Sequence, residues 1–474
     1  MSGEPTKVVL IGTYELGRQP FGIASAAAWL RREGALVTCL DLAVEPWRDE
    51  VVMGVDLVAF HLPMHTATRL AVPLAARIMT LNAEAHLCFF GLYAPMNERY
   101  LRGLGAGTIL GGEFEAGLAA LVARLREGAA PNPMLAPAVS LAKQSFLVPD
   151  RSGLPQLSRY AYLDQGDGRR RIVGYTEASR GCKHLCRHCP VVPVYGGIFR
   201  VVQTEVVLED VAQQVAAGAR HITFGDPDFF NGPGHAVRIV EALHQRFPVL
   251  TYDVTIKIEH LLKHARFIPT LRDTGCVLIT TAVEAVDETI LAIFDKRHTR
   301  ADFTRAVTLC QEVGIALNPT FVTFTPWTNL DGYLDLLAVI EELELVENVA
   351  PVQYAIRLLI PEGSRLLELD QVRRLVGEFD EPALCYPWAH PDPRVDDLYQ
   401  AVRETVRRAG AEGKDRVAIF KQVRALARLA AGETARSSGP AAGATREPVS
   451  SHVHVSAVSH RRSPIPRLSE AWYC

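Results

Sequence analysis

Three cysteines on one short segment are the residues of this chain best suited to chemistry. Cys182, Cys186 and Cys189 stand in a C-x3-C-x2-C spacing, just after a strand-like run at residues 171–176. Thiolates are soft ligands that suit iron–sulfur clusters and zinc. A [4Fe–4S] cluster normally takes four protein thiolates, so three would leave one iron open to an outside ligand. The chain has nine cysteines in all, which makes chance a poor explanation for the grouping.

A zinc site is the structural alternative for the same segment. Zinc in structural sites takes four ligands, and His184 or His188 could supply the fourth beside the three cysteines. The spacing alone leaves both metals open.

With His188 directly before the last cysteine, the segment resembles the signature of the radical S-adenosylmethionine (radical SAM) superfamily. The resemblance implies that Cys182, Cys186 and Cys189 hold a [4Fe–4S] cluster. Its open iron would be chelated by the amino and carboxyl groups of S-adenosylmethionine (SAM). Reductive cleavage would then yield methionine and a 5′-deoxyadenosyl radical that abstracts hydrogen from a substrate. An external reductant, such as flavodoxin or ferredoxin, would supply the electron.

Two acids after a predicted strand occupy the place of that family's GGE motif. The strand at residues 221–224 runs into Gly225, Asp226 and Asp228, where a carboxylate could bind the methionyl ammonium. Barrel active sites are built at such carboxyl ends of strands. The letters differ from GGE, and an Asp-rich turn is the structural alternative.

Two later stretches resemble further cofactor motifs of the family. Glu284, with Lys296 downstream, resembles its G-x-E-S … K-x-x-T region, which implies a contact with the polar end or ribose of SAM. Pro361 and Gly363 resemble the proline-glycine turn that lies against adenine. We therefore count His188, Gly225, Asp226, Asp228, Glu284, Pro361 and Gly363 as predicted cofactor-binding residues.

The N-terminal third alternates buried strands with helices, which predicts a doubly wound, Rossmann-like parallel sheet. The expected strands are continuous apolar runs at residues 7–12, 36–41, 56–61, 86–91 and 108–112. Such runs are typical of strands buried on both faces. The cysteines inside two of them, Cys39 and Cys88, are expected to be core residues.

This arrangement resembles the cobalamin-binding-type domain that precedes many radical SAM barrels. Gly111 and Gly112 resemble its last strand-to-helix turn, where glycines let the backbone approach the corrin. The D-x-H-x-x-G motif that supplies an axial histidine is absent, and His61 and His65 lack its context. The sequence therefore leaves cobalamin binding open.

The whole chain is expected to be an α/β protein of five parts. These are a cobalamin-binding-like Rossmann domain (1–126), a linker (127–167), a partial (β/α)6 TIM-type radical SAM barrel (168–365), a helical region (366–431) and a flexible tail (432–474). The six barrel strands are expected at residues 171–176, 221–224, 251–258, 276–284, 316–325 and 352–360. Cys276 and Cys310 are expected to pack in the core.

Composition and charge exclude several classes. With 48% hydrophobic residues, 22% charged residues and a net charge of −3, the chain shows no footprint of a nucleic-acid-binding protein. We found no signal peptide or apolar run of membrane-spanning length. Nine cysteines in a chain this long indicate a reducing compartment, so we expect a cytoplasmic protein.

The last residues, Trp472-Tyr473-Cys474, contrast with the polar tail that precedes them. They resemble the CUAEP/CCAEP-tail radical SAM (seleno)proteins, whose tails continue to Cys-selenocysteine-Ala-Glu-Pro or Cys-Cys-Ala-Glu-Pro. The resemblance implies truncation at a selenocysteine codon and a catalytic role for Cys474, as a redox or metal-thiolate group.

The sequence thus predicts a radical SAM enzyme acting on an unknown substrate, with methyl transfer the leading reaction if cobalamin is present. The alternative is an iron–sulfur electron-transfer or redox-sensing protein with a reactive C-terminal thiol or selenol. A zinc-stabilised scaffold is the third hypothesis.

Overall fold

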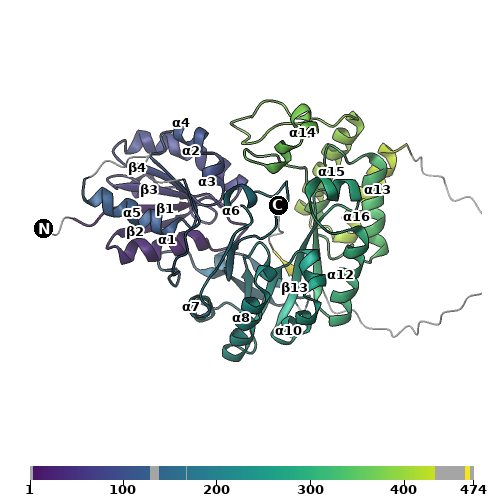
Figure 1. The fold of residues 1–474 in the computed structure, drawn as a ribbon, viewed down its shortest axis with the longest axis horizontal. Helices are drawn as coiled ribbons and strands as arrows, with labels where there is room; N and C mark the ends of the chain where they lie inside the picture. Colours follow the sequence, from purple (N-terminus) through teal and green to yellow (C-terminus); the bar gives the residue numbers. More distant parts are fainter. Residues whose placement is uncertain (1–3, 129–137, 167, 433–464, 470–474) are drawn as a thin grey trace, which may run out of the picture.

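The computed structural model describes residues 4–128, 138–166, 168–432 and 465–469. Figure 1 shows two helix-covered sheets side by side, with the C-terminal helices packed against the second. Among these residues, the first sheet has six strands, the second has seven, and a separate antiparallel ribbon has two. The predicted α/β class is confirmed.

The N-terminal sheet has the order β2-β1-β3-β4-β5-β6. Its first five strands are β1 (Lys7–Gly12), β2 (Leu36–Asp41), β3 (Leu57–His61), β4 (His86–Phe90) and β5 (Thr108–Gly112). Helices α1 (Phe21–Arg32), α2 (His65–Leu81) and α5 (Glu115–Arg126) pack against it. The apolar runs predicted these strands because most of their side chains are buried on both faces, including Cys39 and Cys88, while the edge strand β2 leaves Leu36 exposed.

Two pieces of the predicted linker belong to the sheets. Strand β6 (Val139–Ser140) pairs in parallel with β5, and β7 (Tyr162–Asp164) pairs antiparallel with β8 (Arg170–Thr176). This part of the chain therefore extends the edge of each sheet.

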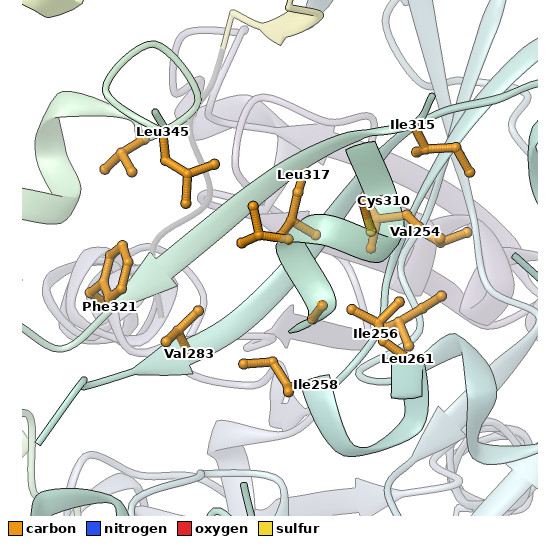
Figure 2. Packing of buried hydrophobic residues seen from close by; sticks show 14 of the residues in the cluster. Val254, Ile256, Ile258, Leu261, Val283, Cys310, Ile315, Leu317, Phe321 and Leu345 are labelled. Atoms are coloured by element: carbon orange, nitrogen blue, oxygen red, sulfur yellow. The ribbon is translucent and has the colours of Figure 1, made fainter. Parts of the chain in front are cut away.

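The second sheet curls into a partial barrel of order β14-β13-β12-β11-β8-β7-β15. Its parallel strands are β8, β11 (His221–Phe224), β12 (Thr251–Thr255), β13 (Cys276–Glu284) and β14 (Ala316–Phe321). Helices α7 (Thr204–Ala216), α8 (Pro233–Arg246), α12 (Arg300–Val313) and α13 (Leu330–Glu342) alternate with them. Figure 2 shows Val254, Leu317 and Cys310 within one apolar cluster, so Cys310 is a packing residue as predicted.

The prediction of a sixth barrel strand at residues 352–360 is wrong. Residues Pro351–Ala355 form a 3-10 helix, and the segment meets β14's continuation through one parallel bridge, Phe324 to Arg357. Backbone pairing is limited to two hydrogen bonds of Phe324, with Ile356 and Leu358. Before them, the Gln353 side chain accepts the backbone N–H of Phe321 at 2.8 Å. Proline at the start of the segment also removes a donor.

The C-terminal region is helical, as expected, with α14 (Asp370–Leu375), α15 (Pro393–Ala411) and α16 (Arg416–Ala430). After the undescribed stretch, residues 465–469 return to the barrel, where β15 (Arg467–Leu468) pairs with β7. No helix among the described residues combines the length and apolarity needed to cross a membrane.

Candidate active site

The cysteine segment lies at the carboxyl end of β8, the first barrel strand. Strand β9 (Ser179–Gly181) leads into Cys182 and pairs with β10 (Phe199–Val201), and α6 (Val192–Tyr195) follows Cys189. Gly181 has φ +73, and a Cβ there would lie 2.4 Å from the carbonyl oxygen of Ile198. Glycine is therefore required for the turn that presents the first cysteine.

Neighbouring strands and turns hold the segment in place. Asn231 Oδ1 accepts the backbone N–H of Lys183 at 3.1 Å, and its Nδ2 donates to the Gly181 carbonyl at 3.3 Å. Further along, the Arg187 N–H donates to the carbonyl of Phe294 at 2.9 Å. These bonds come from two different strand-to-helix connections, so the barrel fixes the segment from both sides.

The spacing of the three sulfurs separates the two metal hypotheses. Around one tetrahedral zinc, with Zn–S of about 2.3 Å, thiolate sulfurs sit about 3.8 Å apart. Among the described residues, one set of His, Cys, Asp or Glu has its ligand atoms within 4.8 Å of one another, and it is His184, Asp228 and His260. The three cysteines do not form such a set, so their sulfurs do not surround a single zinc in this structure. Three thiolates are a donor set that suits a [4Fe–4S] cluster.

Burial makes two of these thiols, Cys182 and Cys189, poor acids without a cationic partner. It raises the pKa of Cys182 to about 11, helped by the charge of Asp228, and it also raises the pKa of Cys189. Metal binding requires the deprotonated sulfur. A positively charged metal centre would stabilise the thiolates against the cost of burial. The Lys296 ammonium is a nearby cation of the protein.

A buried triad of Glu284, Lys296 and His188 stands beside the cysteines. Glu284 Oε1 lies 3.0 Å from Lys296 Nζ and 3.1 Å from His188 Nε2. The ring of His188 stacks on Phe294 with centroids 4.5 Å apart. The ammonium and the imidazole hold the pKa of Glu284 well below its usual range despite burial, which raises it.

Glu284 also has the features of a ligand-binding residue. It has φ +67, at a break in the β13–β14 register between Ala282 and Glu284. Non-glycine residues in this region are strained, and such bulges often re-aim side chains at functional sites. Its Oε2 is buried without a hydrogen-bond partner in the described protein. The same residue lines a small pocket, partly open to solvent, with Trp327 and Thr328. An orphaned carboxylate oxygen beside a cavity fits a donor-rich ligand such as SAM.

Glu284→Gln should destabilise the protein by about 3 kcal/mol or more, because it leaves the Lys296 ammonium buried without its anion. The double variant Glu284→Gln/Lys296→Met should recover most of that loss, since neither buried charge remains. Urea unfolding of both variants measures the difference. Equal losses in the single and double variants would show that the ion pair does not hold this site together.

The two predicted GGE-like acids have different partners. Asp226 accepts from the Ala178 N–H at 2.9 Å and from Ser179 Oγ at 2.5 Å, so it fixes the turn leading to the cysteines. Asp228 caps the short helix Phe229–Asn231, and its Oδ2 lies 3.2 Å from His184 Nε2 and 2.7 Å from His260 Nδ1. Both carboxylates are engaged within the protein, and their binding of the methionyl ammonium stays a prediction.

The buried carboxyl of Asp226 should make the stability of the protein depend on pH, which gives a test of its burial. Burial raises the pKa of Asp226 to about 7 from 3.8, and it raises those of Glu113 and Glu177 to about 7. These three groups hold protons in the folded protein that they have lost in the unfolded chain, so each favours folding less as pH rises from about 4 to 7. Buried histidines with lowered pKa values act in the opposite direction, so the test compares two proteins that share them. The urea midpoint of the iron-free wild type, measured relative to that of Asp226→Asn, should fall between pH 5 and pH 7.5. An unchanged slope in Asp226→Asn would contradict the assignment.

The predicted glycine and proline positions are partly explained by packing. A Cβ at Gly225 would lie 1.8 Å from Tyr175 Oη, so the strand end can bear no side chain there. Gly363 has φ +76 in the turn that starts at Pro361, and Ser364 Oγ donates to the Arg187 carbonyl at 3.3 Å. The structure thus brings this turn against the cysteine segment, and contact with adenine stays a prediction.

Sequence reasoning missed a buried arginine that joins the two sheets. Arg180, two residues before Cys182, lies 2.6 Å from Glu115, 2.7 Å from Glu177 and 3.4 Å from Glu113. Its side chain is 7% exposed. Glu113 and Glu115 follow β5 of the first sheet, so this cluster ties that sheet's edge to the cysteine segment. The sequence offered one signal for this cluster. Arg180 stands beside the cysteine motif, and two acids follow the distant glycine turn.

The glycine turn predicted to admit a corrin is occupied by the chain itself. A Cβ at Gly111 would lie 2.5 Å from Pro95, and one at Gly112 would lie 2.3 Å from the Ser140 carbonyl oxygen. His61 packs against Gly22 and lies 3.5 Å from Glu15, while His65 Nε2 lies 2.7 Å from the Ala383 carbonyl oxygen. Packing within the chain therefore accounts for both glycines, and approach of a corrin to this turn stays a prediction.

The remaining cysteines lie away from these groups or outside the described residues. Cys276 is buried in β13, as predicted, and Cys385 is half-buried in the connector before α15. Cys474 lies outside the described residues, so its predicted catalytic role stays a prediction.

Comparison with known proteins agrees with this geometry. The model of the radical SAM superfamily matches residues 176–335, which cover the cysteines, both acids after β11 and Glu284. This part of the chain is a radical SAM domain.

A curated relative and two solved structures extend the likeness beyond that domain. Hopanoid C-3 methylase from Methylococcus capsulatus (strain ATCC 33009 / NCIMB 11132 / Bath) is 26% identical over 327 residues, 65% of this chain and 62% of the relative's length. The match thus spans less than two thirds of that protein. The radical S-adenosylmethionine methyltransferase TsrM from Kitasatospora setae, with cobalamin and [4Fe-4S] cluster bound, has a TM-score of 0.63 at 15% identity, covering 91% of this chain and 100% of TsrM.

The cobalamin-dependent S-adenosylmethionine radical enzyme OxsB, with aqua-cobalamin and S-adenosylmethionine bound, also has a TM-score of 0.63. It is 15% identical, and the match covers 86% of this chain and 67% of OxsB. At these identities the likeness establishes the fold, a sheet domain followed by a partial barrel.

Proposed function

We propose that this radical SAM enzyme binds a [4Fe–4S] cluster through Cys182, Cys186 and Cys189 and cleaves SAM reductively to act on a substrate. The observation that carries the proposal is the fixed cysteine segment beside Glu284, whose second oxygen is buried and unpartnered among the described residues. When bound, the reduced cluster and SAM together supply a 5′-deoxyadenosyl radical.

The chain's own residues would bind and orient these groups. Three cysteine sulfurs hold three irons and leave the fourth open, because no fourth cysteine stands on the segment. The Lys296 ammonium, near these sulfurs, favours their ionised form. Glu284 Oε2 would accept a hydrogen bond from SAM, while Lys296 and His188 hold its other oxygen in place.

The direct test is anaerobic reconstitution with iron and sulfide, followed by incubation with reductant and SAM. The enzyme should contain about four irons per chain and release 5′-deoxyadenosine. An electron carrier would contain the iron but release none, and a zinc scaffold would contain zinc and no sulfide. Either result would overturn the proposal.

Methyl transfer is a second candidate, supported by the likeness to hopanoid C-3 methylase and TsrM. Cobalamin binding is supported by the same neighbours and by OxsB, but the filled turn at Gly111 and Gly112 gives it no local support. Corrinoid analysis of the purified protein, grown with cobalamin, decides this point. Protein without corrinoid would leave radical chemistry and remove cobalamin-dependent methylation.

A further inference from the structure

The last described segment of the chain closes the open side of the barrel. Strand β15 pairs antiparallel with β7, with Arg467 opposite Asp164 and Leu468 opposite Leu163. The Ser469 N–H donates to the Tyr162 carbonyl at 2.9 Å, and Ser469 Oγ accepts from the Tyr162 N–H at 3.1 Å. This strand therefore forms one edge of the seven-stranded sheet, whose other edge is β14.

An ion pair connects β15, at this edge of the sheet, to the loop beside β14 at the opposite edge. Arg467 Nη2 lies 3.0 Å from Glu347 Oε2, and Glu347 is next to Asn348, whose Nδ2 donates to the Leu317 carbonyl of β14 at 2.7 Å. Arg416, at the start of α16, donates to the carbonyls of Glu347 and Asn348 at 2.7 and 2.9 Å. Two arginines thus converge on one loop at the far edge.

Between the two edges lies a small pocket, partly open to solvent. Its barrel wall is polar, with Thr255 of β12, Thr280 of β13 and Asn318 of β14, and its outer wall is Pro466, Arg467 and Leu468. Because Thr255 pairs with Thr280 and Thr280 with Asn318, these side chains share one face of the sheet. The C-terminal segment is therefore a wall of a chamber inside the barrel.

The charges on the chamber wall are mainly positive. Arg18, Arg416 and Arg467 line it, and Asp253 is its one acid. That carboxylate is already engaged, since its Oδ1 lies 2.8 Å from His221 Nε2 and accepts from Thr223 Oγ1 at 2.6 Å. Burial, with the Arg467 charge, lowers the pKa of Arg416 to about 10. Arg467 Nε is also buried without a hydrogen-bond partner in the described protein.

We propose that this chamber binds an anionic group of the substrate, a carboxylate or a phosphate, through Arg416 and Arg467, with β15 as its outer wall. An anion there would give a partner to Arg467 Nε, which has none in the described protein, and guanidinium donors suit both groups. The assignment to a substrate rests on the proposed function, because the chamber lies in the barrel that carries the cysteine segment.

The test uses full-length protein with inorganic phosphate and acetate as probes, at ionic strength matched with chloride. Hydrogen exchange of the peptide containing residues 465–469 is read at increasing probe concentration. The better-fitting anion should slow this exchange, and chloride should not. Phosphate acting alone identifies a phosphoryl group, and acetate acting at least as well identifies a carboxylate.

Arg467→Gln should weaken the apparent affinity for the probe by at least about tenfold, since a charge-assisted bond is lost. Arg467→Lys should lose less affinity for the probe, because it keeps the charge. The exposed Arg394→Gln should keep the affinity of wild type. Protection in wild type that persists in Arg467→Gln, or no protection by either probe, would overturn the inference.

Iron content and SAM cleavage without substrate separate this inference from the proposed function. Both are measured in wild type beside the probe titration, and both should be unchanged in the exposed Arg394→Gln variant. If wild type binds the probe but releases no 5′-deoxyadenosine, the proposed function fails and the anion site stands.

Discussion

Replacing Cys186 with alanine should abolish cluster assembly and lower 5′-deoxyadenosine formation by more than about 100-fold, since losing outer-shell partners of metal ligands already costs 10–100-fold. The same result is expected for Cys182→Ala and Cys189→Ala, because each sulfur would hold one iron. The fold itself should survive, since removing one buried sulfur costs about 1 kcal/mol. Iron and sulfide analysis, with product measured by mass spectrometry, gives the readout.

The matched control is Cys385→Ala, a half-buried cysteine outside the segment. It should keep full iron content and activity. Retention of the iron–sulfur absorbance in any of the three segment variants, at wild-type iron content, would show that the cluster is held elsewhere.

Arg180→Met should lower the free energy of unfolding by about 3–5 kcal/mol, because it leaves carboxylates buried without their cation. Glu115 is the most affected, since it is fully buried and its remaining partners are Ser25 and Gln144. Because Arg180 joins the first sheet to β9, iron binding at the adjacent Cys182 should fall as well. Urea unfolding and iron analysis measure the two effects.

Two variants control this prediction. Arg180→Met/Glu115→Gln should regain part of the stability, because the most buried charge is then removed. Arg246→Met, which breaks an exposed pair with Glu209, should cost less than about 1 kcal/mol. A loss in Arg180→Met no larger than in Arg246→Met would contradict a joining role for this arginine.

Local patterns predicted the elements that depend on local burial. The strands at residues 7–12 and 276–284 match the structure because a continuous apolar run is buried on both faces wherever it pairs. The cysteine segment was evident because its ligands lie close in sequence. Lys296 and Glu284 were found by resemblance, and their contact at 3.0 Å agrees with it.

The missed features depend on partners far apart in the chain. Strand β15 pairs with residues about 300 positions earlier, as the Tyr162–Ser469 separation of 307 shows, and a two-residue strand has no periodicity to detect. The joining role of Arg180 depends on Glu115, and the filled turn at Gly112 depends on Ser140. The prediction of a sixth strand was wrong because residues Pro351–Ala355 form a 3-10 helix and the Gln353 side chain binds the Phe321 N–H, which composition does not reveal.

The most direct test of the account is the electron paramagnetic resonance spectrum of the reduced, reconstituted protein with and without SAM. Three cysteine ligands leave one iron open, so SAM should change the g-values of the cluster signal, and SAM carrying ¹⁵N in its amino group should show coupling to the cluster spin. A cluster signal that SAM leaves unchanged, with no ¹⁵N coupling, would mean that the fourth iron is closed and that the chain does not perform this chemistry.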